Sequence, residues 1–239
     1  PAAGRVTRWL AGARGTFAPI VRADLSAALV GSLAALDSGV PRDPFHLTGE
    51  EAGAMGGEFG PESIWIGRYG EPRLIYSAPA FRRGAYKGAD RRSVHMGVDL
   101  FLSAGSSVHA PFAALVEHVE YRDDNLDYGG LVVLKHVTPE GDWFSTLYGH
   151  LERETVRHLE RGQRIARGAP FAALGALEEN GGWAPHLHFQ LILDSALVGD
   201  QWPGVADRDD LEYRQALCPN PAALLNMPDE RVAYVPLDS

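Results

Sequence analysis

Short apolar runs, most of them alternating with polar residues, recur along the chain from Ser63 onward. Clusters of glycine, proline, aspartate and asparagine separate them at spacings typical of antiparallel strands joined by turns. Successive side chains of a strand point to opposite faces, so this alternation indicates strands with one face in a core. The pattern predicts a mainly β domain over residues 63–222. Its expected strands lie in SIWIGRY, RLIYS, VHMGVDLFL, SSVHA, ALVEHVEY, LVVLKHV, WFSTLYGHL, PFAAL and HLHFQLIL.

The first 62 residues show a different pattern. Apolar residues at helical spacing are followed by a stretch that is rich in glycine and proline. A leucine stripe at intervals of four and three residues runs from Leu25 to Leu36 and predicts an amphipathic packing helix. A signal peptide is the alternative for this apolar run. Asp24 adjoins the run, however, and its twelve residues are too few to cross a bilayer. We therefore expect an N-terminal helical segment and linker over residues 1–62.

The segments between and after the expected strands are less regular. Residues 152–160 fit either one short helix or an irregular loop, and residues 209–217 predict a short helix. A helix stub and an extended exit are expected in the C-terminal tail or linker, residues 223–239. Asp123–Gly130 predicts a polar hairpin turn rather than a calcium loop, because Tyr128 stands where such a loop requires glycine.

Composition narrows the class of protein. The 239 residues are 45% apolar and 22% charged, as in ordinary soluble globular proteins. The net charge of −9 argues against a nucleic-acid partner, which needs clustered lysine and arginine. A single cysteine, Cys218, excludes an internal disulfide and favours a cytoplasmic location. Because the apolar run from Leu25 is too short to cross a bilayer, we expect no membrane partner. The chain begins at Pro1, so we expect a piece of something longer; export after removal of a signal segment is the alternative.

Two histidines stand one residue apart at the start of an expected strand. His186 and His188 share one face of that strand, while Leu187 and Phe189 face the core on the other side. Pro185 restricts the backbone just before them. Taken alone, the pair is more typical of half-exposed histidines on a sheet surface than of a functional site.

A second polar pair, His95 and Asp99, stands four residues apart in VHMGVDLFL. A straight strand would separate them by about 13 Å. Two ligands of one zinc ion must lie within about 3 to 4 Å of each other, so the segment must bend for both to bind it. Gly97 lies between them and tolerates such a bend. The alternative is a turn carboxylate beside a surface histidine.

A third element, His150, follows an alternating run and a glycine, which suits an imidazole at the end of a strand beside a groove. Two histidines and one carboxylate together form the ligand set of a catalytic zinc site with an open position. Two further imidazoles would then remain for proton transfer. The other histidines of the chain, among them His136 and His158, are expected to be surface or packing residues, with a place near the groove as the alternative for His136. Trp183 is expected either to anchor the core or to line a substrate site.

These segments resemble the lysostaphin-like or LytM-like zinc metallopeptidases over about Arg92–Leu193. The family's His-x-x-x-Asp, Tyr-x-His-Leu and Pro-His-Leu-His-Phe motifs match this chain in the same order. The resemblance implies the duplicated-hybrid-motif fold, in which antiparallel sheets form an open groove. It also implies a Zn²⁺ cofactor. The metal ligands would be His95, Asp99 and His188, and the catalytic histidines that do not bind metal would be His150 and His186.

The resemblance further implies metal-assisted hydrolysis of an amide, with a peptide or a peptidoglycan-like molecule as substrate. Zinc would polarise the scissile carbonyl and lower the pKa of its bound water towards about 7. The chain departs from the family pattern at ENGGWAP, at Gln190, where an acidic residue is usual, and at Ala114, where glycine is common. These departures leave the metal ligands intact and put the peptidoglycan substrate in doubt.

Four segments resemble the middle module of large fused proteins: IGRYGEPRLIY, NGGWAPHLHFQ, GDQWPGVA and LCPNP. In those proteins a phosphotransferase-like module precedes, and an aminotransferase-like module follows. This resemblance implies neighbouring modules and a small soluble peptide or amide as substrate. The rival hypothesis is a non-catalytic metal-binding or scaffolding module of a multidomain protein.

The N-terminal helix is a candidate for contacts between subunits of an oligomer.

Overall fold

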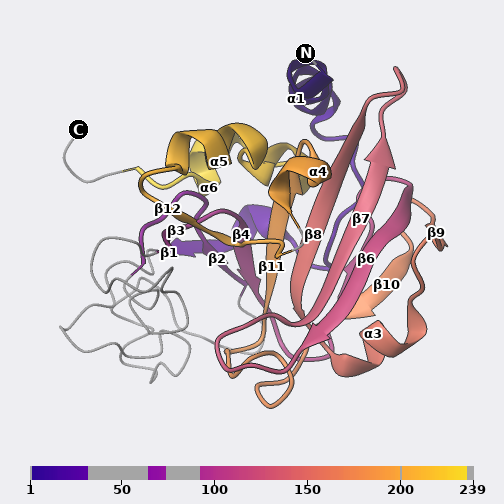
Figure 1. Ribbon diagram of the computed structural model, residues 1–239, viewed down its shortest axis with the longest axis vertical. Helices are drawn as coiled ribbons and strands as arrows, with labels where there is room; N and C mark the ends of the chain where they lie inside the picture. Colours follow the sequence, from indigo (N-terminus) through magenta and orange to yellow (C-terminus); the bar gives the residue numbers. More distant parts are fainter. Residues whose placement is uncertain (1, 32–63, 74–91, 200, 236–239) are drawn as a thin grey trace.

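The computed structural model describes residues 2–31, 64–73, 92–199 and 201–235 (Figure 1). Its main feature is an eight-stranded sheet in which β1 and β2 are parallel and the other neighbours are antiparallel. In spatial order its strands are β1 (Leu29–Gly31), β2 (Trp65–Gly67), β4 (Val98–Phe101), β11 (His186–Ile192), β8 (Trp143–Leu151), β7 (Gly129–Val137), β6 (Ala114–Arg122) and β9 (Arg164–Ile165). The expected mainly β fold is confirmed.

Two small antiparallel sheets accompany the main one. In one, β3 (Arg92–His95) pairs with β12 (Val205–Asp207); in the other, β5 (Ser107–His109) pairs with β10 (Pro170–Ala173). The chain passes from β3 into β4 through Met96 and Gly97, so the two strands lie in different sheets. The predicted bend at Gly97 is therefore present.

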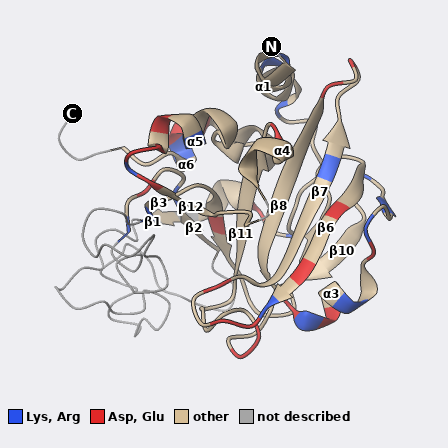
Figure 2. Cartoon of the chain, viewed as in Figure 1, with Lys and Arg blue, Asp and Glu red and all other residues tan. Residues whose placement is uncertain are grey.

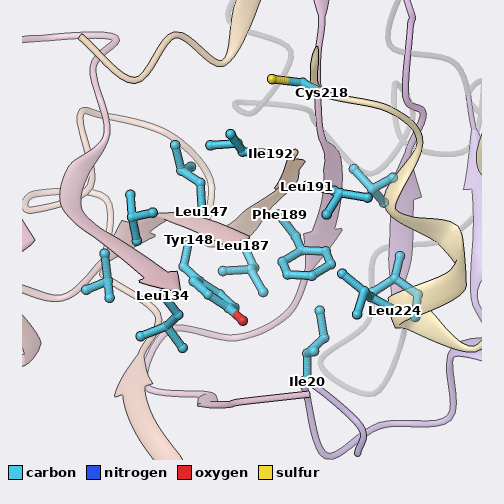
Figure 3. Close-up of a cluster of buried hydrophobic side chains, with 14 of the residues drawn as sticks. Ile20, Leu134, Leu147, Tyr148, Leu187, Phe189, Leu191, Ile192, Cys218 and Leu224 are labelled. Atoms are coloured by element: carbon cyan, nitrogen blue, oxygen red, sulfur yellow. The ribbon is translucent and has the colours of Figure 1, made fainter. Parts of the chain in front are cut away.

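The core centres on β8 and β11, which lie side by side in the middle of the main sheet. Every residue of β11 is buried. Figure 3 shows Phe189 of β11 close to Tyr148 of β8, with Ile20 and Leu224 coming from the two ends of the chain. Burying one such aromatic side chain contributes about 1.5 to 3 kcal/mol. Because β11 is packed on both sides, its polar side chains are held in fixed positions.

Helices pack around the edges of the sheets, as Figure 1 shows. In α1 (Ala2–Ala13) the buried residues Val6 and Leu10 share one face, and Trp9 packs against three phenylalanine rings with centroids 5.4 to 5.9 Å away. The expected N-terminal helix and short C-terminal helices are confirmed. The shorter helices are α3 (Arg153–His158), α4 (Ser195–Val198), α5 (Leu211–Leu217), η5 (Pro221–Leu225) and α6 (Asp229–Val232).

One prediction about local structure was wrong. The amphipathic helix expected from Leu25 is replaced by a 3₁₀ turn, η1 (Leu25–Ala27), and then by β1. The Asp24 side chain accepts a hydrogen bond from Ser26 N and so caps that turn, and β1 then finds main-chain partners in β2. Residues 32–36 of the predicted helix lie outside the described residues. In the C-terminal tail the expected helix stub is present as α6, and Ala233 after it is extended and bridges to Tyr69.

The structure decides between the two alternatives for residues 152–160 and leaves the predicted domain boundaries untested. Residues 153–158 form α3, so the helical alternative for that segment is confirmed. The division of the chain at residues 62 and 222 stays a prediction, although β1 from the first part pairs with β2 from the second. Most of the expected linker and of the RLIYS strand lies outside the described residues.

The charged residues are interspersed by sign on the face seen in Figure 2, most clearly along α3 and β6. Among the described residues, no helix has the length and apolar character needed to cross a membrane.

His136, in β7, makes a stability prediction possible. Its ring is buried, with Nδ1 3.1 Å from Ala113 O and Nε2 2.7 Å from Thr146 Oγ1, and burial lowers its pKa from 6.5 to about 4. The neutral ring's contribution is therefore complete above pH 6.5 and is lost as the pH falls towards 4. The expected loss is about 3 kcal/mol of unfolding free energy.

Denaturant titrations at several pH values should show that the unfolding free energy of His136→Gln falls less steeply on acidification than that of the wild type. The same substitution at the exposed His158 is the control, and an unchanged slope in His136→Gln would contradict the assignment.

Candidate metal centre

The strand register brings His95, Asp99 and His188 together. His95 ends β3, and Asp99 lies in β4 after the bend at Gly97. In the antiparallel pairing of β4 with β11, Asp99 is directly opposite His188. Facing residues of adjacent antiparallel strands have Cβ atoms about 4.5 to 5.5 Å apart, which allows side-chain contact. The bend at Gly97 and the strand register thus bring the three side chains together.

The three side chains form a compact, buried donor set. His95 Nε2 lies 3.1 Å from Asp99 Oδ1, and His188 Nδ1 lies 3.3 Å from the same oxygen. The two nitrogens are 2.9 Å apart. Donors in a tetrahedral zinc site with bonds of about 2.0 to 2.1 Å are about 3.3 to 3.4 Å apart. The side chains are at most 5% exposed. The residues present therefore fit a divalent zinc-like ion.

Hydrogen bonds on the far side of each ring determine which nitrogen faces the centre. His95 Nδ1 lies 3.0 Å from Arg68 O, which can only accept, so this nitrogen carries the proton. His188 Nε2 lies 3.0 Å from Gln190 Oε1 and donates to it. The nitrogens that face each other therefore both carry lone pairs. Histidines that bind metal are oriented in the same way by such outer partners.

Asp99 Oδ1 completes the case for a cation. This buried oxygen lacks a hydrogen-bond partner among the described residues. Two lone-pair nitrogens and one carboxylate oxygen, all within about 3 Å of each other, repel one another in a buried space unless a positive charge lies between them. The donor chemistry, two imidazoles and one carboxylate, suits zinc and leaves a fourth position open.

Electrostatics keep these groups in the protonation states that metal binding requires. Burial alone would raise the pKa of Asp99, but His95 and Arg73 outweigh burial and hold that pKa well below its ordinary value. Burial, together with the Arg73 guanidinium, lowers the pKa of His95 to about 4. At neutral pH the carboxyl is therefore ionised and the imidazole neutral.

Two more imidazoles flank the donor set. His150 Nδ1 donates to Asn180 O at 2.9 Å, and His186 Nδ1 donates to Ala184 O at 2.7 Å, so both Nε2 atoms carry lone pairs. The ring centroids are 4.2 Å apart, and His186 Nε2 lies 3.9 Å from Asp99 Oδ1. Burial lowers the pKa of His186 to about 4 and also lowers that of His150.

The backbone at His150 is unusual. Its φ of +64° lies in the left-handed region, which is uncommon for residues other than glycine. Hydrogen bonds hold this conformation: His150 N donates to Tyr128 O at 2.8 Å, and His150 O accepts from Gly175 N at 2.9 Å. Such conformations cluster at functional sites.

A pocket of about 340 Å³ opens beside the donor set and is bordered by His150 and His188. Trp183 lines it, although its side chain is nearly buried and its Nε1 donates to Asp127 O at 3.1 Å. Both readings of Trp183, core anchor and pocket wall, therefore hold. The remaining walls come from Arg92, Arg122, residues 124–128, Gln201 and residues 203–205. Their positions in the sequence carried no signal of this role.

Gly97 is expected to be intolerant of any side chain. A Cβ atom there would lie 2.7 Å from His188 Cε1 and 2.7 Å from Phe189 O. We expect Gly97→Ala to weaken zinc binding at least about 10-fold, an effect comparable to loss of an outer-shell partner. Metal competition with a chromophoric chelator would measure it. Gly12→Ala in α1 is the matched control, because its Cβ meets nothing within 4 Å and alanine favours a helix. Equal zinc affinity in both variants would contradict the close approach.

Comparisons with known proteins agree with the residues assembled here. Residues 93–198 match the sequence model described as peptidase family M23, which confirms the expected resemblance to lysostaphin-like zinc metallopeptidases. An uncharacterized metalloprotease of Haemophilus influenzae is 33% identical over 104 residues, which cover 44% of this chain and 20% of that protein.

Among solved structures, a zinc-containing peptidase from Vibrio cholerae is 23% identical, with a TM-score of 0.35 over 52% of this chain and 36% of that one. The lysostaphin catalytic domain from Staphylococcus simulans is 19% identical, with a TM-score of 0.36 over 56% of this chain and 86% of that one. The chain thus spans well under half the length of the Haemophilus and Vibrio proteins.

Proposed function

We propose, from the match of residues 93–198 to peptidase family M23, that this chain is a zinc-dependent peptide or amide hydrolase. One observation carries the proposal: two lone-pair nitrogens and an unpartnered carboxylate oxygen converge in a buried space. In this proposal His95 Nε2, Asp99 Oδ1 and His188 Nδ1 hold the metal. His150 and His186 act on the substrate.

A bound zinc ion would supply a Lewis acid that polarises the scissile carbonyl and lowers the pKa of water. The protein contributes the proton transfers. The Nε2 of one ring, His150 or His186, accepts a proton from the attacking water, and the same proton is returned to the leaving amine nitrogen. The lowered pKa values of both rings keep these nitrogens unprotonated at neutral pH and thus able to accept. The Nε2 of the other ring, which also carries a lone pair, would accept a hydrogen bond from the same water and orient it.

The pocket supports a peptide-sized substrate. Its volume of about 340 Å³ lies at the lower end of the range of small-molecule sites. Arginine and aspartate side chains line it together with Tyr128 and Trp183, so polar and apolar parts of a peptide both find partners. We propose a short soluble peptide or a peptidoglycan-derived fragment as substrate.

The test is to incubate the zinc-loaded protein with short peptide libraries and with purified peptidoglycan fragments. Mass spectrometry would identify new amino termini. We expect cleavage of at least one class, its loss after chelation, and its return when zinc is restored. His158→Ala, which removes an exposed imidazole from α3, is the control and should cleave as the wild type does.

A protein that binds one zinc ion and cleaves neither class would contradict the hydrolase proposal. That outcome would favour the rival function, a non-catalytic metal-binding or scaffolding module.

A further inference from the structure

The two oxygens of Asp99 have different surroundings. Oδ1 faces His95 and His188, whereas Oδ2 lies 2.6 Å from Arg73 Nη1. We propose that Arg73 is a positioning residue that fixes the Asp99 carboxylate so that only Oδ1 faces the metal. This inference rests on the metal centre of the proposed function. Sequence spacing gave no sign of it, because Arg73 lies 26 residues before Asp99.

The guanidinium of Arg73 is itself held in place. Its Nε donates to Glu71 Oε2 at 3.0 Å, while Nη1 binds Asp99. Arginine presents several N–H donors in a rigid planar fork, so contacts to two carboxylates determine its orientation. All three side chains are at most 2% exposed. Glu71 thus orients Arg73, and Arg73 orients Asp99.

The backbone brings this chain of contacts to the metal centre. Glu71 O accepts from His95 N at 2.9 Å, and Arg73 N donates to Ser93 O at 3.0 Å. Pro72 pairs with Val94 between these bonds. The segment therefore runs antiparallel beside β3, the strand that ends in His95, and its position is coupled to that of a metal ligand.

The consequence for the metal centre concerns the number of donors. A carboxylate with both oxygens free could turn and offer both to a metal. That would fill the position that a catalytic zinc site leaves open for water or substrate. With Oδ2 engaged by Arg73, Asp99 offers Oδ1 alone. Arg73 also compensates part of the negative charge that Glu71 and Asp99 bring into the interior.

The experiment compares wild type, Arg73→Gln, Arg73→Lys and Glu71→Gln, each titrated with cobalt(II) as the metal probe. Two quantities are measured: the cobalt dissociation constant and the visible absorption spectrum at saturation, which reports the coordination geometry. We expect Arg73→Gln to weaken binding about 10- to 100-fold, as loss of an outer-shell partner does, and to change the spectrum. Lysine keeps the charge but not the fork, so Arg73→Lys should change the spectrum as well.

Arg214→Gln in α5 is the matched control, because Arg214 Nε makes a comparable bond of 2.8 Å to Asp210 Oδ2 away from the metal centre. It should keep wild-type cobalt affinity and spectrum. A merely structural role of Arg73 would lower the melting temperature and leave the spectrum of the bound cobalt unchanged.

Should Arg73→Gln fail to fold, Arg73→Lys and Glu71→Gln decide the matter. Wild-type affinity and spectrum in both of these variants would overturn the proposal. A wild-type protein that binds no cobalt would instead refute the metal centre itself. Binding without hydrolysis would refute only the proposed enzymatic function.

Discussion

Replacing His188 with alanine is expected to abolish zinc binding and, with it, hydrolysis. His188 Nδ1 is one of three donors, and a catalytic zinc needs all three protein ligands to be retained during turnover. We expect zinc affinity to fall at least about 100-fold. Loss of an outer-shell hydrogen-bond partner costs about 10- to 100-fold, and loss of a direct ligand should cost no less than that. Metal analysis after dialysis against a weak chelator measures this directly.

The substitution also removes packing, so folding must be checked. His188 lies in a fully buried strand and its ring contacts that of Tyr128, with centroids 5.5 Å apart. Circular dichroism of the variant separates loss of metal from loss of fold. His158→Ala, at an exposed position of α3, should retain one zinc per chain. Unchanged zinc content in a folded His188→Ala variant would refute the ligand assignment.

The second large effect is expected at the two imidazoles outside the donor set. His186→Gln and His150→Asn should each slow hydrolysis about 10²- to 10⁴-fold, the usual contribution of a general acid or base, while zinc content stays near one per chain. Asparagine is chosen at position 150 because it tolerates the left-handed backbone found there. Steady-state rates and metal analysis on the same samples are the measurements.

These two variants also separate catalysis from metal binding. The Nδ1 atoms of both rings donate to backbone carbonyls, so neither residue holds a ligand in place through that nitrogen. Loss of zinc from either variant would indicate that the replaced histidine is itself a metal ligand. Wild-type hydrolysis rates in both variants would show that neither histidine takes part in the reaction.

Much of the candidate site followed from local spacing. A strand with histidines two residues apart places both imidazoles on one face, and the structure brings both rings within 4 Å of Asp99 Oδ1. The four-residue spacing of His95 and Asp99 required a bend at Gly97, which is present. The roles of these residues stay predictions, because geometry alone does not assign them.

What sequence could not supply depends on contacts between distant segments. The helix expected from Leu25 was wrong because pairing of β1 with β2 outweighs a leucine period in this stretch. Arg73 and Glu71 carry no recognisable spacing, since only the pairing of their segment with β3 brings them to Asp99. The pocket walls at residues 124–128 and 203–205 likewise meet only in three dimensions.

Gln190 illustrates how a departure from a family pattern acquires a physical meaning. Its Oε1 accepts a hydrogen bond from His188 Nε2, as an acidic side chain could. Its amide nitrogen also donates to Pro203 O at 3.3 Å, which a carboxylate cannot do. The amide thus links a proposed metal ligand to the pocket wall that follows the matched segment.

The most direct test of the metal centre is a crystal structure of the protein loaded with one equivalent of zinc, with diffraction data collected on both sides of the zinc absorption edge. We expect one anomalous peak per chain, about 2.0 to 2.2 Å from His95 Nε2, Asp99 Oδ1 and His188 Nδ1. A zinc peak elsewhere, or none at this position in a protein that retains its zinc, would contradict the account.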